Sequence, residues 1–134
     1  MGECVIVSAV GLIDRDGRVL LTTRPEGKDY AGFWEFPGGK IEDGERAESA
    51  LVRELREELG IRTEESCLAP FSFGTDSDTG LLLLLFLCRK WDGAAQGLEG
   101  QELKWVAPSE LLAHDMPPID RPLAAQLRDF LSGL

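Results

Sequence analysis

The chain has 134 residues, the length of one domain of ordinary size, so we expect a single domain that spans residues 1–134. Hydrophobic residues make up 43% of the chain and charged residues 28%, which excludes a disordered protein, and no apolar run approaches the ~20 residues of a membrane span. A formal net charge of −10 excludes a broad basic surface, so we expect no binding to duplex nucleic acid and no membrane attachment.

The cysteines indicate the compartment. Cys4, Cys67 and Cys88 are odd in number and far apart, so they offer neither a disulfide framework nor the paired spacing of a zinc site. This usage is typical of a reducing environment. We therefore expect a cytoplasmic protein, and we expect it to be a monomer or a weak dimer.

The first part of the chain predicts a β-hairpin followed by an irregular segment. Residues 4–13 are rich in Val and Ile, residues 14–17 (Asp-Arg-Asp-Gly) favour a turn, and residues 19–21 form a second apolar run. Residues 34–39 (Trp-Glu-Phe-Pro-Gly-Gly) hold too much Pro and Gly for a regular element, although the segment can begin as a short strand.

Residues 46–59 predict an α-helix. Leucine recurs every four residues along one face of it, at Leu51, Leu55 and Leu59. Glu45 and Glu48 favour the positive N-terminal end of the helix, and Gly60 stands where a C-cap glycine belongs.

The remaining segments predict alternating strands and helices. Residues 68–74, 81–88 and 103–106 predict strands, and the nearly all-apolar residues 81–88 indicate a strand that is covered on both faces. Residues 109–114 and 122–131 predict two helices. Strands flanked by helices favour a layered α/β fold.

Three glutamates gather on one edge of the predicted central helix. Positions three and four apart are neighbours on a helix, so Glu54, Glu57 and Glu58 fall within an arc of about 100°. Like charges this close repel, whereas a divalent cation makes the arrangement favourable. Carboxylate oxygens suit Mg²⁺ or Mn²⁺, and Arg53 can hold a carboxylate in a fixed orientation. The alternative is an acidic surface helix that carries glutamate for solvation.

The spacing around this helix resembles a complete Nudix box, Gly39-x5-Glu45-x7-Arg53-Glu54-Leu55-x-Glu57-Glu58-x-Gly60-Ile61. Residues 34–42 and 89–93, Arg24 and the prolines at 117–118 further resemble MutT-type nucleoside triphosphate pyrophosphohydrolases. The resemblance implies the Nudix fold, an α/β/α sandwich around a mixed β-sheet with the box as a loop–helix–loop. It also implies hydrolysis of a (deoxy)nucleoside triphosphate to the monophosphate and pyrophosphate with Mg²⁺, for which Mn²⁺ can substitute.

The resemblance implies a role for each matching residue. The expected metal ligands are the carbonyl of Gly38 and the carboxylates of Glu54, Glu57, Glu58 and Glu99. Glu54 or Glu99 takes the proton from the attacking water, and the sequence leaves that choice open. Arg53 is the third expected catalytic residue.

Four residues match substrate-contacting positions of MutT-type relatives: Arg24, Glu35, Phe36 and Asp120. Three of them have a structural alternative. Arg24 can form a surface ion pair, Phe36 can belong to the ordinary core, and Asp120 can cap the helix that begins near Pro122.

Asp120 also departs from the MutT pattern, which has Asn there. An ionised Asp only accepts hydrogen bonds, so Asp120 can receive protons from a guanine-like base or from the amino group of cytosine but cannot donate to guanine O6. We expect sanitation of the nucleotide pool through 8-oxo-dGTP, with CTP or a modified dCTP as the alternative substrate. A third hypothesis is a non-catalytic Nudix-fold binding module, a class that typically loses the box glutamates that this chain retains.

Overall fold

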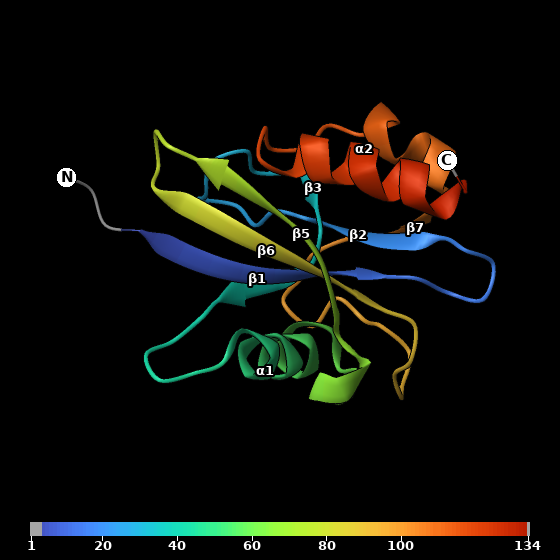
Figure 1. Cartoon of the computed structure of the whole chain (residues 1–134), viewed down its shortest axis with the longest axis horizontal. Helices are drawn as coiled ribbons and strands as arrows, with labels where there is room; N and C mark the ends of the chain where they lie inside the picture. The colour runs from blue at the N-terminus through green and yellow to red at the C-terminus, as the bar shows by residue number, and fades with distance from the viewer. Residues whose placement is uncertain (1–3, 134) are drawn as a thin grey trace.

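A computed structural model describes residues 4–133 of the chain. Two β-sheets lie between helix α1 (Ala47–Leu59) on one side and helix α2 (Asp120–Leu131) on the other (Figure 1). The strands are β1 (Val5–Leu12), β2 (Val19–Thr23), β3 (Trp34–Glu35), β4 (Gly38–Lys40), β5 (Ala69–Asp76), β6 (Leu81–Cys88) and β7 (Leu103–Val106). Two short 3-10 helices complete the described elements, η1 (Glu65–Cys67) and η2 (Pro108–Ala113). The layers agree with the expected α/β sandwich.

The larger sheet is mixed, as expected, and has the strand order β4-β1-β6-β5. β1 and β6 run parallel over their full length, from the pair Val5 and Leu81 to the pair Leu12 and Cys88. β4 and β5 flank them in antiparallel pairing. The smaller sheet is antiparallel, with the order β3-β2-β7.

Alternation along the two central strands divides the core into two clusters. Val10 of β1 and Phe86 of β6 belong to the cluster packed on α1, whereas Ala9 and Leu85, one residue earlier on each strand, belong to the cluster packed on α2. Side chains of successive residues point to opposite faces of a strand, so each strand supplies both clusters. The prediction that residues 81–88 are covered on both faces is confirmed.

The predicted hairpin is wrong, although its turn forms. The backbone N–H of Asp14 donates to the carbonyl of Arg18 and closes the turn. Beyond it, β1 and β2 share only the isolated bridge between Ile13 and Val19, and they belong to different sheets. β1 pairs instead with β4 at Val7–Ala9 and with β6 along its full length.

The Pro- and Gly-rich segment begins as the short strand that the sequence allows and is irregular at Phe36 and Pro37, but the prediction of an irregular segment is wrong at Gly38 and Gly39, which belong to β4. β3 pairs with β2 and β4 pairs with β1, and the chain therefore changes sheets at Phe36 and Pro37. The carbonyl of Pro37 still accepts the N–H of Val10, which keeps the crossing close to β1.

The helix predictions hold with one change of type. α1 begins at Ala47 and ends at Gly60, which adopts the left-handed conformation with φ 70°, as a C-cap glycine should. α2 begins at Asp120, two residues before the predicted start, and the segment expected to be a helix from residue 109 is the 3-10 helix η2 instead. Within residues 4–133, no helix is long and apolar enough to cross a membrane.

Candidate active site

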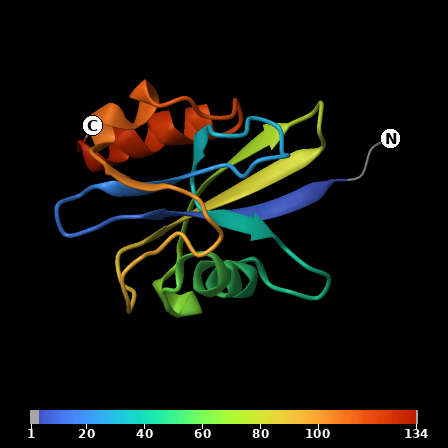
Figure 2. The ribbon, with the colours of Figure 1, turned by 180° about the vertical axis from the view of Figure 1, so that it is seen from behind.

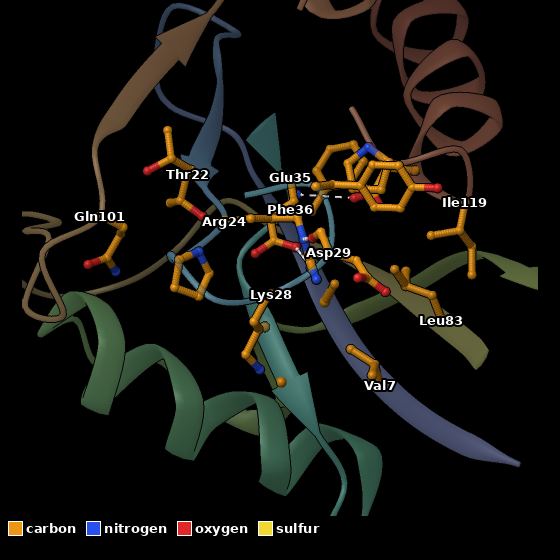
Figure 3. Close-up of a pocket in the computed structure, with 18 of the residues that line it drawn as sticks. Val7, Thr22, Arg24, Lys28, Asp29, Glu35, Phe36, Leu83, Gln101 and Ile119 are labelled. Atoms are coloured by element: carbon orange, nitrogen blue, oxygen red, sulfur yellow. Dashed lines mark hydrogen bonds and ion pairs between the residues drawn. The ribbon is translucent and has the colours of Figure 1, made fainter. Parts of the chain in front are cut away.

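A cleft with a volume of about 1210 Å³ is lined by residues of both sheets, of α1 and of α2. In Figure 3, Val7, Leu83 and Ile119 lie on one side of it and Gln101 on the other, with Phe36 between them. Eight of the ten residues predicted for the site line this cleft: Arg24, Glu35, Phe36, Gly38, Glu54, Glu58, Glu99 and Asp120. The other two, Arg53 and Glu57, are absent from the lining, although Arg53 donates a hydrogen bond to Glu54.

The acidic end of the cleft is built on α1 and β4. The carboxyl group of Glu54 lies against Gly39, where a Cβ atom would overlap it. A Cβ atom on the neighbouring Gly38 would overlap the backbone of Ser8 in the paired strand β1. Gly39 therefore leaves room for the Glu54 side chain, whereas Gly38 is required by the close pairing of β4 with β1.

Arg53 connects three of the box glutamates. Its Nε and Nη2 atoms donate to the two carboxylate oxygens of Glu45 at 2.8 and 3.0 Å, and this guanidinium holds the pKa of Glu45 down at about 2. Its Nη1 atom donates to Glu54 at 2.9 Å and to Glu57 at 3.4 Å. The predicted orienting role of Arg53 thus has the contacts that it requires. Glu57 points to Arg53, and its side chain is 52% exposed.

Glu99 reaches the acidic end because the segment before β7 docks on the end of α1. The N–H of Gln96 donates to the carbonyl of Leu59, and the N–H of Leu98 donates to that of Glu58. Seen from behind in Figure 2, this segment passes next to α1 before it enters β7. Glu99 is thereby brought close to Glu58, although it lies 41 residues further along the chain by the difference of the two residue numbers.

Glu58 has a strongly perturbed carboxyl group. Burial, followed by the negative charges of Glu54, Glu99 and Glu35, raises its pKa to about 9. Crowded, partly buried carboxylates of this kind are favourable only when a cation or a proton neutralises them.

The acidic end fits a hard divalent cation because its donors are carboxylate oxygens. Among residues 4–133, no three acidic, His or Cys side chains form a ready-made cage for a metal ion. Mg²⁺ does not require such a cage, since it commonly takes one or two carboxylates together with waters and substrate phosphates. Glu54, Glu58 and Glu99 together offer three carboxylates, which is more than the one or two that Mg²⁺ commonly takes.

The opposite end of the cleft is apolar and closes on Asp120. Asp120 is 2% exposed, and its Oδ2 atom accepts the backbone N–H of Phe36 at 3.4 Å. Burial, and then the charge of Glu35, raises the pKa of Asp120 to about 7. No side-chain cap is present at the start of α2, so the alternative of Asp120 as an N-cap is wrong. Phe36 is both core and cleft wall, since it packs in the cluster on α2 and lines the pocket.

Arg24 and Glu35 form an ion pair in the wall of the cleft. Nη1 of Arg24 donates to Oε1 of Glu35 at 2.7 Å, and Nε donates to the carbonyl of Asp29 at 2.7 Å. Each side chain of the pair is 24% exposed, so the pair is neither a free surface bridge nor fully buried. Burial nevertheless raises the pKa of Glu35, against the effect of Arg24.

Two polar contacts of the site were not predicted. The sequence places Glu45 at the helix N-terminus and in the Nudix-box spacing but predicts no partner for it, whereas in the structure it is the strongest partner of Arg53. Gln101 was given no role, but its side chain contacts both Glu99 and Glu58. Glycines at positions 97 and 100 signal a tight loop around Glu99, but only the folded register of that loop on α1 reveals Gln101.

Comparisons of the sequence and the structure with known proteins identify the family of this chain. The NUDIX domain family matches residues 3–127. A CTP pyrophosphohydrolase of Escherichia coli K12 is 40% identical, with 89% of this chain and 88% of the relative covered. An 8-oxo-dGTP diphosphatase of the same strain is 38% identical, with 90% and 94% covered. A structure from a study of MutT of Aliivibrio salmonicida and Vibrio cholerae superimposes with a TM-score of 0.84 at 35% identity, covering 96% of this chain and 99% of the other. The chain therefore belongs to the Nudix family and is a Nudix hydrolase of nucleoside triphosphates.

Proposed function

We propose that this Nudix hydrolase uses Mg²⁺ to cleave 8-oxo-dGTP to 8-oxo-dGMP and pyrophosphate, and that it thereby cleanses the nucleotide pool. The observation that carries the proposal is the single cleft with a cluster of carboxylates at one end and a buried acid in an apolar pocket at the other. A triphosphate and a flat base are the two parts of a ligand that such a cleft accommodates.

Glu54, Glu58 and Glu99 would hold the metal ion, with the carbonyl of Gly38, and Glu57 would join after leaving Arg53. Hydrolases of this family generally use a divalent metal ion. When bound, the ion neutralises the charge of the phosphate oxygens and makes a bound water more acidic. The protein then contributes a proton acceptor, Glu54 or Glu99, and the Arg53 guanidinium that fixes the direction of the Glu54 carboxylate.

The chemistry of Asp120 supports recognition of 8-oxoguanine better than the residue type alone indicates. With a pKa near 7, Asp120 is neutral in part of the molecules at neutral pH. A neutral carboxyl group donates one hydrogen bond and accepts another, as the Asn of the MutT pattern does. It can therefore donate to O6 and accept from the N7–H of 8-oxoguanine.

CTP or a modified dCTP is the second candidate substrate, because Asp120 also suits cytosine. The neutral acid can pair with N3 and the amino group of cytosine, and the ionised acid can still accept from that amino group. The E. coli relative named as a CTP pyrophosphohydrolase is similar over most of the chain.

We further propose a cytoplasmic enzyme that is a monomer or a weak dimer and does not bind duplex nucleic acid. The described cysteines are free thiols, as a reducing compartment requires. The net charge of −10 opposes contact with a phosphate backbone.

A panel of nucleoside triphosphates, assayed for pyrophosphate release with Mg²⁺, tests the proposal. We expect turnover that EDTA abolishes, with the highest kcat/KM for 8-oxo-dGTP among 8-oxo-dGTP, dGTP, CTP and a modified dCTP. The highest value for CTP would transfer the assignment to the second candidate. If the protein binds nucleotides but hydrolyses none of the panel, the hypothesis of a non-catalytic binding module is the correct one.

A further inference from the structure

Gln101 joins two acidic segments of the cleft through a single side-chain amide. Its Oε1 atom accepts the backbone N–H of Glu99 at 2.9 Å, and its Nε2 atom donates to the backbone carbonyl of Glu58 at 3.1 Å. Both hydrogen bonds end on main-chain atoms of residues whose side chains line the acidic end. In Figure 3, Gln101 stands on the segment that approaches α1.

The carbonyl of Glu58 belongs to the last turn of α1, where the helix leaves carbonyl groups without intrahelical partners. It accepts two donors, the N–H of Leu98 and the Nε2 of Gln101. The contact through Leu98 fixes where the segment touches the helix. The hydrogen bond from Gln101 closes the loop on the C-terminal side of Glu99 and so fixes the orientation of the backbone at Glu99.

This tether acts against electrostatic repulsion. Glu58 and Glu99 both line the acidic end of the cleft, so their like charges repel each other. Glu99 is exposed and, among residues 4–133, its carboxylate has no hydrogen-bond or ion-pair partner that would hold it there. A neutral amide can hold the two segments together without adding a charge to the cluster.

We infer that Gln101 is a positioning residue, which keeps Glu99 beside Glu58 so that the acidic end is organised before a metal ion and a triphosphate arrive. The inference rests on the proposed function of that end. Partners of this kind, one layer behind the groups that contact a metal, affect metal affinity or activity by about 10–100-fold in other proteins.

The substitution Gln101→Met tests the inference, because it keeps the length of the side chain and removes both hydrogen bonds. We expect equilibrium binding of Mn²⁺ alone, measured from the paramagnetic signal of the free ion, to weaken by about 10-fold or more. We also expect kcat with Mg²⁺ to fall by a similar factor, while KM for the nucleotide stays within about twofold. Gln101→Ala removes the same contacts with a smaller side chain and must show the same losses.

Gln96→Met is the matched control. Gln96 lies in the same segment, its backbone N–H donates to the carbonyl of Leu59 at the end of α1, and its side chain is exposed. This variant should bind Mn²⁺ and turn over like the wild type. Circular dichroism and thermal melting of all variants without metal separate a loss of fold from a loss of site organisation.

A double-mutant cycle with Glu99→Gln decides whether Gln101 acts through Glu99. If it does, Gln101→Met costs little further Mn²⁺ affinity once Glu99 is replaced. A Gln101→Met protein that melts earlier but binds Mn²⁺ like the wild type overturns the inference, as does full additivity in the cycle. A wild-type protein that neither binds Mn²⁺ nor hydrolyses a nucleotide would instead contradict the proposed function.

Discussion

Arg53 and Glu45 form a two-point ion pair that fastens the loop before α1 to the middle of that helix. Two nitrogens of the guanidinium donate to the two oxygens of one carboxylate, at 2.8 and 3.0 Å. The third nitrogen is thereby directed at Glu54, 2.9 Å away. One residue of the loop thus determines how a carboxylate in the cleft is oriented.

Glu45→Gln should disturb Glu54 without touching the cleft itself. We expect kcat to fall by about 10-fold, because the glutamine cannot hold both guanidinium nitrogens and Arg53 loses its fixed direction. The pH dependence has a defined sign. The folded protein lowers the pKa of Glu45 from 4.5 to about 2, so the stabilisation by Glu45 is complete above pH 4.5 and disappears as the pH falls towards 2. Melting temperatures of wild type and Glu45→Gln should therefore differ at pH 6 and converge near pH 2; a constant difference would contradict the prediction.

Glu58→Gln should make the metal-free protein more stable while it abolishes most activity. The folded state raises the pKa of Glu58 from 4.5 to about 9, so this group binds a proton more tightly in the folded than in the unfolded protein. Its contribution to stability therefore decreases as the pH rises from 4.5 to 9. In EDTA we expect the variant to melt at least about 3 °C above the wild type at pH 8, and to gain less at pH 5. Turnover with Mg²⁺ should fall by about 100-fold or more, because a metal-ligand charge is lost; normal turnover would contradict the assignment.

Asp120→Asn should remove a pH dependence of base preference. As the pH rises through 7, wild-type Asp120 loses the proton that it donates to O6 of 8-oxoguanine, whereas the amino group of cytosine can still donate to the ionised acid. The ratio of kcat/KM for 8-oxo-dGTP to that for CTP should therefore drop by about 10-fold between pH 6 and pH 8 in the wild type. Asn keeps both a donor and an acceptor, so the ratio for the variant should stay constant. If the substitution leaves the ratio unchanged at every pH, Asp120 does not read the base.

Gly39→Ala and Gly38→Ala should fail in different ways. A Cβ atom on Gly39 would meet the Glu54 carboxyl group first, and this end of a flexible side chain can move aside, so we expect a folded protein with kcat reduced by about 10–100-fold. A Cβ atom on Gly38 would meet the backbone of Ser8 and Ala9, which cannot move without separating β4 from β1. Gly38→Ala should therefore melt much earlier than Gly39→Ala, and equal melting temperatures would contradict the distinction.

Local signals of the sequence sufficed for α1 and for the box. These signals are the leucine repeat, the glycine at position 60 and the three neighbouring glutamates. All of them act within one helix, so the sequence predicts the helix and its acidic edge without knowledge of the fold. The hairpin between β1 and β2 failed because strand pairing is decided by which edges other segments occupy. β4 and β6, which come later in the sequence than β2, pair with β1 instead.

The less predictable parts of the site depend on long-range packing. The sequence shows an Asp at position 120, but its raised pKa of about 7 follows from burial and from the charge of Glu35, which only the folded chain provides. Likewise, Gln101 becomes part of the site only because its segment runs past the last turn of α1. The roles of the individual glutamates in catalysis stay predictions until the variants above are measured.

The two ends of the cleft are contributed by elements from opposite sides of the sheets. Glu54 and Glu58 belong to α1, whereas Asp120 is the first residue of α2. If Asp120 reads the base as proposed, an exchange of the short stretch that leads into α2 redirects the enzyme to another nucleobase while the acidic half continues to work unaltered. On that proposal, residues 117–120 are a small and separable target for laboratory evolution of new substrates.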